Sequence, residues 1–193
     1  MKNVLRSAAA AAAILITQLP AQAAIDVKGV KFEDNTQVGG QSISLNGAGV
    51  RTKFFMSVYA AGLYVPKKDG SAQTLVAQSG PKSVHAVLLM NLTAAEFADA
   101  LVKGFTANHT PQEMTKLQSR LDELKNLIYS FGEAKKGMAL HLDFVPGAGT
   151  RVLVDGQQKG KDIPGEDFYQ GLLKIWLGEH PVDSDLKGSL TGK

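Results

Sequence analysis

The sequence predicts an α+β fold in which a large antiparallel sheet carries helices on one face. Three observations support this prediction. Segments typical of strands come first, helical segments are grouped in the middle, and a hairpin followed by one more helix closes the chain. In proteins with a parallel sheet, strands and helices alternate along the chain, so this order favours an antiparallel sheet.

The first predicted strands lie between residues 27 and 65. Residues 27–32 and 41–45 alternate between apolar and polar side chains, and Gly39-Gly40 between them is typical of a turn. Residues 54–65 are apolar at both odd and even positions. This pattern predicts a strand that is covered on both faces.

A predicted strand at residues 82–90 is followed by two helices. The tetrapeptides that begin at Thr93 and Thr110 have the sequences TAAE and TPQE, and both are capping boxes. The first helix is expected to run to about Gly104, and the second to cover residues 111–131. Apolar residues recur along the second helix at three- and four-residue steps and predict one buried stripe. The stripe consists of Met114, Leu117, Leu121, Leu124, Ile128 and Phe131.

The last part of the chain predicts a hairpin and a helix. Residues 140–144 alternate in a way that indicates one solvated face, and a Pro-Gly-Ala-Gly turn leads to a second strand at residues 150–155. A final helix is expected at residues 166–177, where Gly178 ends it.

The N-terminus has the three parts of a secretory signal peptide. Lys2 and Arg6 precede an apolar stretch of nine residues at positions 8–16, and small residues lead up to Ala23. We expect cleavage after Ala23, export from the cytoplasm, and a single domain at residues 24–193. No stretch reaches the roughly 18 apolar residues of a membrane-spanning helix, so we expect no transmembrane anchor.

Composition excludes several classes of function. The chain has 21 basic and 18 acidic residues, and without Lys2 and Arg6 the balance is 19 to 18, a net charge of +1. Such a balance argues against a nucleic-acid partner. The chain has no cysteine, which excludes disulfides, a thiol nucleophile and a thiolate metal site.

Common catalytic and metal-binding motifs are missing from the sequence, and we expect neither a metal nor a cofactor. No two histidines have HExxH or HxH spacing. Gly47-Ala-Gly49 resembles the start of a phosphate loop but lacks a third glycine, and we interpret it as a turn. His141 and Asp143 share one face of a predicted strand, which we interpret as a solvated face.

One segment, residues 47–64, combines an arginine and two tyrosines with an otherwise apolar run. A guanidinium is a planar fork of donors that suits a carboxylate, and a tyrosine hydroxyl can complete such a site. In an apolar pocket the pair would select an amphipathic acid. Tyr59 shares the parity of Arg51, but eight residues of straight strand span about 26 Å. The two can meet only if the backbone turns or another strand intervenes. The alternative is an exposed Arg51, with Tyr59 and Tyr64 in the core.

Within this segment, Gly-x-Gly-x-Arg-Thr-Lys followed by Val-Tyr-Ala-Ala-Gly-Leu-Tyr resembles the chalcone isomerase superfamily, particularly its bacterial exported chalcone isomerase-like branch. The likeness is specific over residues 47–65 and looser across the rest of the mature chain. It implies an open-faced β-sandwich, in which a helical layer covers one face of a large antiparallel sheet, and a periplasmic location. The order of elements agrees with this architecture.

The superfamily contains enzymes that cyclise chalcones and non-catalytic relatives that bind fatty acids. The resemblance implies that Arg51 and Tyr59 hold the carboxylate of a ligand. We also expect Tyr64 and Phe97 to be ligand-binding residues. The enzymes carry an active-site tyrosine at the position of Phe97, which has no hydroxyl, and a threonine at the position of Tyr59. These departures argue against cyclisation.

We therefore expect a non-catalytic periplasmic protein that binds a small amphipathic carboxylic acid, fatty-acid-like, or another apolar ligand. Two alternatives stay open. One is an intramolecular lyase of the chalcone isomerase type, in which Arg51 stabilises an oxyanion. The other is an envelope-assembly protein whose apolar interior is simply core. The sequence does not identify protein partners.

Overall fold

The computed structural model describes residues 24–193, and the predicted signal peptide, residues 1–23, lies outside the described part. Seven antiparallel strands form one large sheet in the order β3-β4-β5-β6-β7-β8-β9, which confirms the predicted α+β class. The strands are β3 Asn35–Val38, β4 Gln41–Lys53, β5 Met56–Val65, β6 Lys82–Leu88, β7 Ala139–Val145, β8 Gly149–Val154 and β9 Gln157–Ile163.

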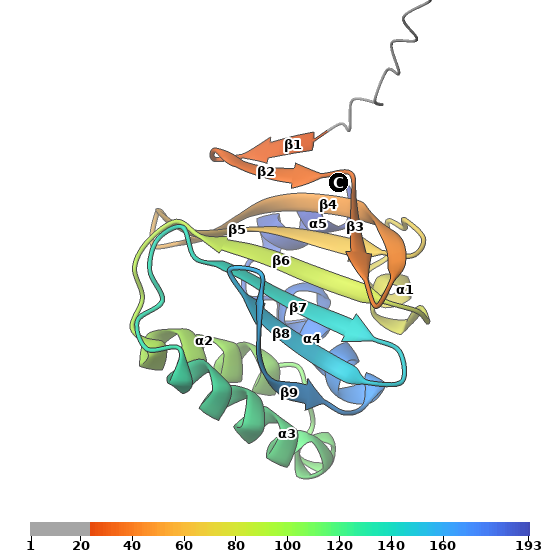
Figure 1. Ribbon diagram of the computed structural model, residues 1–193, viewed down its shortest axis with the longest axis vertical. Coiled ribbons are helices and arrows are strands. Elements are labelled where there is room, and N and C mark those ends of the chain that lie inside the picture. Colours follow the sequence, from red (N-terminus) through yellow and green to blue (C-terminus); the bar gives the residue numbers. More distant parts are fainter. Residues whose placement is uncertain (1–23) are drawn as a thin grey trace, which may run out of the picture.

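Helices cover one face of this sheet, and a small hairpin covers part of the other (Figure 1). The helices are α1 Ala72–Ala77, α2 Ala94–Thr106, α3 Pro111–Ser130, α4 Glu166–Leu177 and α5 Ser184–Leu190. Helices α2 and α3 lie on the opposite side of the sheet from the hairpin (Figure 1). Among the helices described in residues 24–193, none combines the length and the apolar character that a membrane span requires.

The hairpin consists of β1, Ala24–Val27, and β2, Val30–Glu33. A single strand was predicted at residues 27–32, and that prediction is wrong. Lys28 and Gly29 have φ angles of 55° and 82°, so the chain turns back between the two halves. Phe32 of β2 then packs on the outer face of the large sheet.

Both predicted capping boxes form. The Thr93 hydroxyl accepts from the backbone N–H of Glu96, whose carboxylate accepts from the backbone N–H of Thr93 at 2.8 Å. Thr110 and Glu113 make the same exchange, at 2.7 Å for the bond to the carboxylate. Helix α3 buries the predicted stripe, of which four members are fully enclosed: Leu117, Leu121, Leu124 and Ile128.

Strand β5 has both of its faces covered, as predicted. Tyr59 and Leu63 point into the main core on the helical side. Ala60 and Tyr64 point into a second core on the outer side, together with Phe32. Neighbouring residues of the strand therefore belong to different cores.

Strand β4 corrects the interpretation of Gly47-Ala-Gly49 as a turn. Both glycines lie inside the strand, where they allow helix α5 to pack directly on the backbone. A Cβ atom on Gly49 would lie 2.6 Å from the Cβ atom of Ser189, and one on Gly47 would meet the carbonyl oxygen of Ser189. The glycines serve close packing, not phosphate binding.

The structure also corrects the interpretation of a solvated face on β7. Asp143 is only 8% exposed, and His141 is half-buried. Residues of β2 and β3, including Glu33 and Asn35, lie over this part of the sheet and limit the access of water.

Candidate functional site

Arg51 and Tyr59 come together because the chain reverses between them. Residues 54–65 were predicted as one strand, but Phe54 and Phe55 form a two-residue turn with φ angles of 48° and 63°. Strand β5 then pairs with β4, and Arg51 lies directly opposite Tyr59 in the register. The guanidinium carbon is 5.5 Å from the centroid of the Tyr59 ring. The turn supplies the close approach that a straight strand would prevent.

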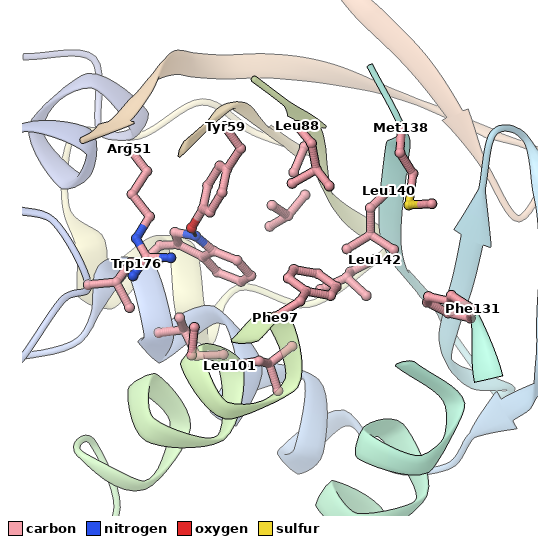
Figure 2. A pocket seen from close by; sticks show the side chains of 15 residues that line it. Arg51, Tyr59, Leu88, Phe97, Leu101, Phe131, Met138, Leu140, Leu142 and Trp176 are labelled. Carbon is pink, nitrogen blue, oxygen red and sulfur yellow. Dashed lines mark hydrogen bonds between the residues drawn. The ribbon is translucent and has the colours of Figure 1, made fainter. Parts of the chain in front are cut away.

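The pair lines one end of a cavity between the large sheet and helices α2 and α4 (Figure 2). The other side chains that line it are apolar or aromatic: Val84, Ala86, Leu88, Phe97, Ala100, Leu101, Phe131, Met138, Leu140, Leu142, Ile175, Trp176 and Val182. The cavity has a volume of about 40 Å³. Pockets that hold small-molecule ligands are typically about 300–1,000 Å³. A ligand larger than a few waters therefore requires that lining side chains move.

Arg51 carries a hydrogen-bond donor that no protein group uses. Its Nε atom is buried without a partner, and none of the ion pairs in residues 24–193 includes it. The Asp183 carboxylate, whose charge acts on Tyr59, accepts from the backbone N–H of Thr52 at 2.8 Å and caps helix α5, and it forms no ion pair with Arg51. An unpaired buried donor is costly, which marks this point as one where a ligand acceptor would be stabilised.

Tyr59 offers a second donor beside Arg51. The indole Nε1–H of Trp176 donates to the Tyr59 hydroxyl oxygen at 2.8 Å, so that oxygen acts as an acceptor. The Tyr59 hydroxyl proton has no acceptor of its own in residues 24–193. Burial raises the pKa of Tyr59, although the adjacent Arg51 charge opposes part of this shift. The phenol therefore stays protonated at neutral pH and can donate to an anion.

The structure brings together three of the four residues that the sequence suggested for ligand binding. Phe97, on the first turn of α2, lines the same cavity as Arg51 and Tyr59 (Figure 2). Tyr64 does not, which corrects its grouping with them. It lies an odd number of residues from Tyr59 on β5 and so points to the outer face, where its ring is 4.5 Å from that of His85.

Trp176 is the site residue that the sequence did not single out. It was expected only as a buried residue of the final helix, and it is 7% exposed. The available signal was its indole N–H, since a buried tryptophan usually finds a hydrogen-bond acceptor. The identity of that acceptor depends on the packing of α4 against β5.

Comparison with known proteins supports the fold. The chain matches the model of the chalcone isomerase-like family over residues 24–192. Among solved structures it is similar to a fatty-acid binding protein of Arabidopsis thaliana, with 15% sequence identity and a TM-score of 0.63. That similarity covers 84% of this chain and 92% of the Arabidopsis chain. No curated protein matches the sequence.

Proposed function

Because the chain belongs to the chalcone isomerase-like family, we propose that it binds a small amphipathic carboxylic acid, such as a fatty acid, without catalysing a reaction. The observation that carries this proposal is the buried, unpartnered Nε of Arg51 beside the free hydroxyl proton of Tyr59. Both groups are donors, and the rest of the cavity is apolar. The arrangement therefore suits an anionic head and a hydrocarbon tail.

The proposed ligand requires the cavity to open, and the half-buried side chains in its lining indicate where. Phe131 and Met138 border the connection between α3 and β7, and they lie at the end of the cavity away from Arg51 (Figure 2). Both are half-buried, as is Phe97. Methionine adapts easily to new neighbours because its side chain is unbranched and flexible. The tail of the acid would displace these side chains while its head stays at Arg51.

The similarity to the Arabidopsis protein agrees with this proposal, because that protein is named for fatty-acid binding. The cavity also lacks a feature of the enzymes in the superfamily. By its resemblance in sequence to these enzymes, the chain has Phe97 in place of their active-site tyrosine, and Phe97 provides no hydroxyl group for chemistry. We therefore favour binding over isomerisation.

Titration calorimetry with a long-chain fatty acid tests the proposal. A hydrogen bond to a charged group contributes about 1.5–3 kcal/mol, so Arg51→Ala should weaken binding roughly 10- to 150-fold. Arg51→Lys should restore only part of the affinity, because an ammonium lacks the planar fork. Arg120→Ala is the matched control. Arg120 pairs with Asp167 at 2.6 Å and does not line the cavity, so its loss should leave the affinity unchanged.

The corresponding fatty alcohol separates head-group recognition from simple apolar binding. It should bind the wild-type protein more weakly than the acid and respond little to Arg51→Ala. If acid and alcohol bind equally and Arg51→Ala changes neither, the carboxylate site is wrong. If the protein cyclises a chalcone faster than the spontaneous reaction and Arg51→Ala abolishes that activity, the protein is an isomerase.

We also propose that the protein acts in the periplasm after removal of residues 1–23. The support is the signal-peptide pattern in the sequence. N-terminal sequencing of protein from the periplasmic fraction of an expressing bacterium should begin at Ala24. Recovery of the intact N-terminus, or of the protein only in the cytoplasm, would contradict export.

A further inference from the structure

The outer face of the large sheet carries a second group of polar side chains, separate from the Arg51 cavity. His85 of β6 and His141 of β7 are direct cross-strand partners, and Asp143 follows two residues later on β7. Residues two apart on a strand share a face, so all three side chains lie on the outer face. Their neighbours in the sequence, such as Val84 and Leu142, point instead into the Arg51 cavity.

These three side chains converge. One nitrogen from each imidazole and one carboxylate oxygen of Asp143 all lie within 4.8 Å of one another. The two imidazole rings stack with their centroids 3.6 Å apart and their planes at 7°. Both rings line a hollow of about 170 Å³ that residues of β2 and β3 border, Glu33 among them. The two histidines therefore face a common, partly enclosed space, and the Asp143 carboxylate lies beside them.

The imidazole nitrogens are available to bind a ligand. Within residues 24–193, the only imidazole nitrogen in a hydrogen bond is Nδ1 of His109, 2.7 Å from a carbonyl oxygen of Phe105. Imidazole binds a metal ion in its neutral form, through the ring nitrogen that carries no proton.

We propose that His85, His141 and Asp143 form a three-ligand site for a divalent transition-metal ion, and that Zn²⁺ suits their two nitrogens and one oxygen. Three protein ligands leave the fourth tetrahedral position of Zn²⁺ open, and two of the three, His85 and His141, border the hollow. Sites of this kind are the ones that hold a water molecule or a further ligand on the metal.

Binding requires a modest rearrangement. Zinc–nitrogen and zinc–oxygen bonds of about 2.0–2.2 Å in a tetrahedron place the ligand atoms about 3.3–3.5 Å apart. Ligand atoms that now lie up to 4.8 Å apart must draw together, and the imidazole rings must rotate out of their stack. The strands need not move, because His85 and His141 are already paired across the sheet.

Groups around the site support a metal ligand role for Asp143. The Ser83 hydroxyl donates to its Oδ1 atom, an arrangement that orients a metal-binding carboxylate. Arg151 is the cross-strand partner of Asp143, but its guanidinium pairs with Asp162 at 2.6 Å. That ion pair offsets a positive charge that would otherwise oppose a cation. Lys31 and Glu33 also border the hollow and carry opposite charges.

Calorimetric titration of tag-free, chelator-treated protein with ZnCl₂ tests the site. We expect saturable binding of one ion per chain. His85→Ala and His141→Ala should each lower the affinity roughly 100-fold or more, since loss of an outer partner alone typically lowers metal affinity about 10- to 100-fold. Ser83→Ala, which removes only an outer partner of Asp143, should therefore lower the Zn²⁺ affinity by about 10- to 100-fold. Asp143→Asn keeps the shape of the side chain and removes its charge, so it tests the carboxylate if an alanine variant fails to fold.

Two controls separate this site from adventitious binding and from the proposed acid site. His180 is exposed and lies outside the group, so His180→Ala should leave Zn²⁺ binding unchanged. Arg51→Ala should also leave it unchanged, because the Arg51 cavity lies on the other face of the sheet. The absence of saturable binding, or an equal loss in His180→Ala and His85→Ala, would overturn the proposal. Neither result would bear on the binding of fatty acids.

Discussion

Replacement of Tyr59 by phenylalanine should destabilise the fold through its effect on Trp176. The change removes one oxygen atom from a side chain that is 5% exposed, and with it the acceptor of the 2.8 Å hydrogen bond from the Trp176 indole. Trp176 is itself 7% exposed, so its N–H is left inside the protein without this acceptor. A buried donor left without a partner costs about 1–3 kcal/mol, and we expect Tyr59→Phe to lower the free energy of unfolding by that amount.

Tyr64→Phe is the matched control for this prediction. Tyr64 belongs to the same strand and is 2% exposed, but its hydroxyl forms no hydrogen bond within residues 24–193. The same chemical change should therefore alter the free energy of unfolding by less than about 0.5 kcal/mol. Urea unfolding of the ligand-free proteins, followed by circular dichroism, gives both values.

A double-mutant cycle isolates the hydrogen bond. When Trp176→Phe has already removed the donor, Tyr59→Phe should cost at least about 0.5 kcal/mol less than it does in the wild-type protein. Equal costs for Tyr59→Phe and Tyr64→Phe, or equal costs of Tyr59→Phe in both backgrounds, would refute the reasoning.

Four further variants test the packing and the turns by the same urea measurement. Leu121→Ala should lower the free energy of unfolding by about 2–5 kcal/mol, because Leu121 is fully buried in the α3 stripe; a change below about 0.5 kcal/mol would mean that the stripe is not packed. Replacement of Phe54-Phe55 by Asn-Gly should stabilise the protein by about 1–2 kcal/mol, because ordinary residues adopt left-handed φ angles at a cost. A loss of stability there would show that the exposed aromatic rings make contacts that matter. Gly49→Ala should destabilise by about 1–3 kcal/mol through its clash with α5, whereas Gly188→Ala, with open space around it in α5, should stabilise by about 0.5–1 kcal/mol. Similar effects of the two alanines would contradict the close approach of α5 to β4.

The sequence by itself determined the features that depend on neighbours within a few residues. The boxes at Thr93 and Thr110 predicted where α2 and α3 begin, because each cap is a contact over three residues. The stripe around Leu121 predicted the buried face of α3, because helical periodicity repeats over one or two turns. Residues 54–65, apolar at both odd and even positions, predicted a strand covered on both faces, because side chains alternate between the faces of a strand every residue. The order of these elements was sufficient to predict the α+β class.

Only the tertiary structure decided how the site residues meet. The turn at Phe54-Phe55 was hidden, because such turns usually contain asparagine or glycine, and two phenylalanines look like a continued strand. The register shift between Leu45 and Gly47 was equally invisible, yet it sets which face of β4 carries Arg51. A shift of one residue moves every later side chain to the other face of a sheet.

The remaining features of the two proposed sites depend on contacts between distant parts of the chain. Trp176 donates to a residue 117 positions earlier, and His85 reaches His141 only because β6 and β7 are neighbours in the sheet. Metal-binding sequence motifs such as HExxH describe ligands on a single helix or strand. They therefore cannot identify a pair of histidines that lie on two different strands. Side-chain chemistry is local to each residue and can be read from the sequence. Which side chains face one another depends on strand register and helix packing, and these are set by the burial of the whole core.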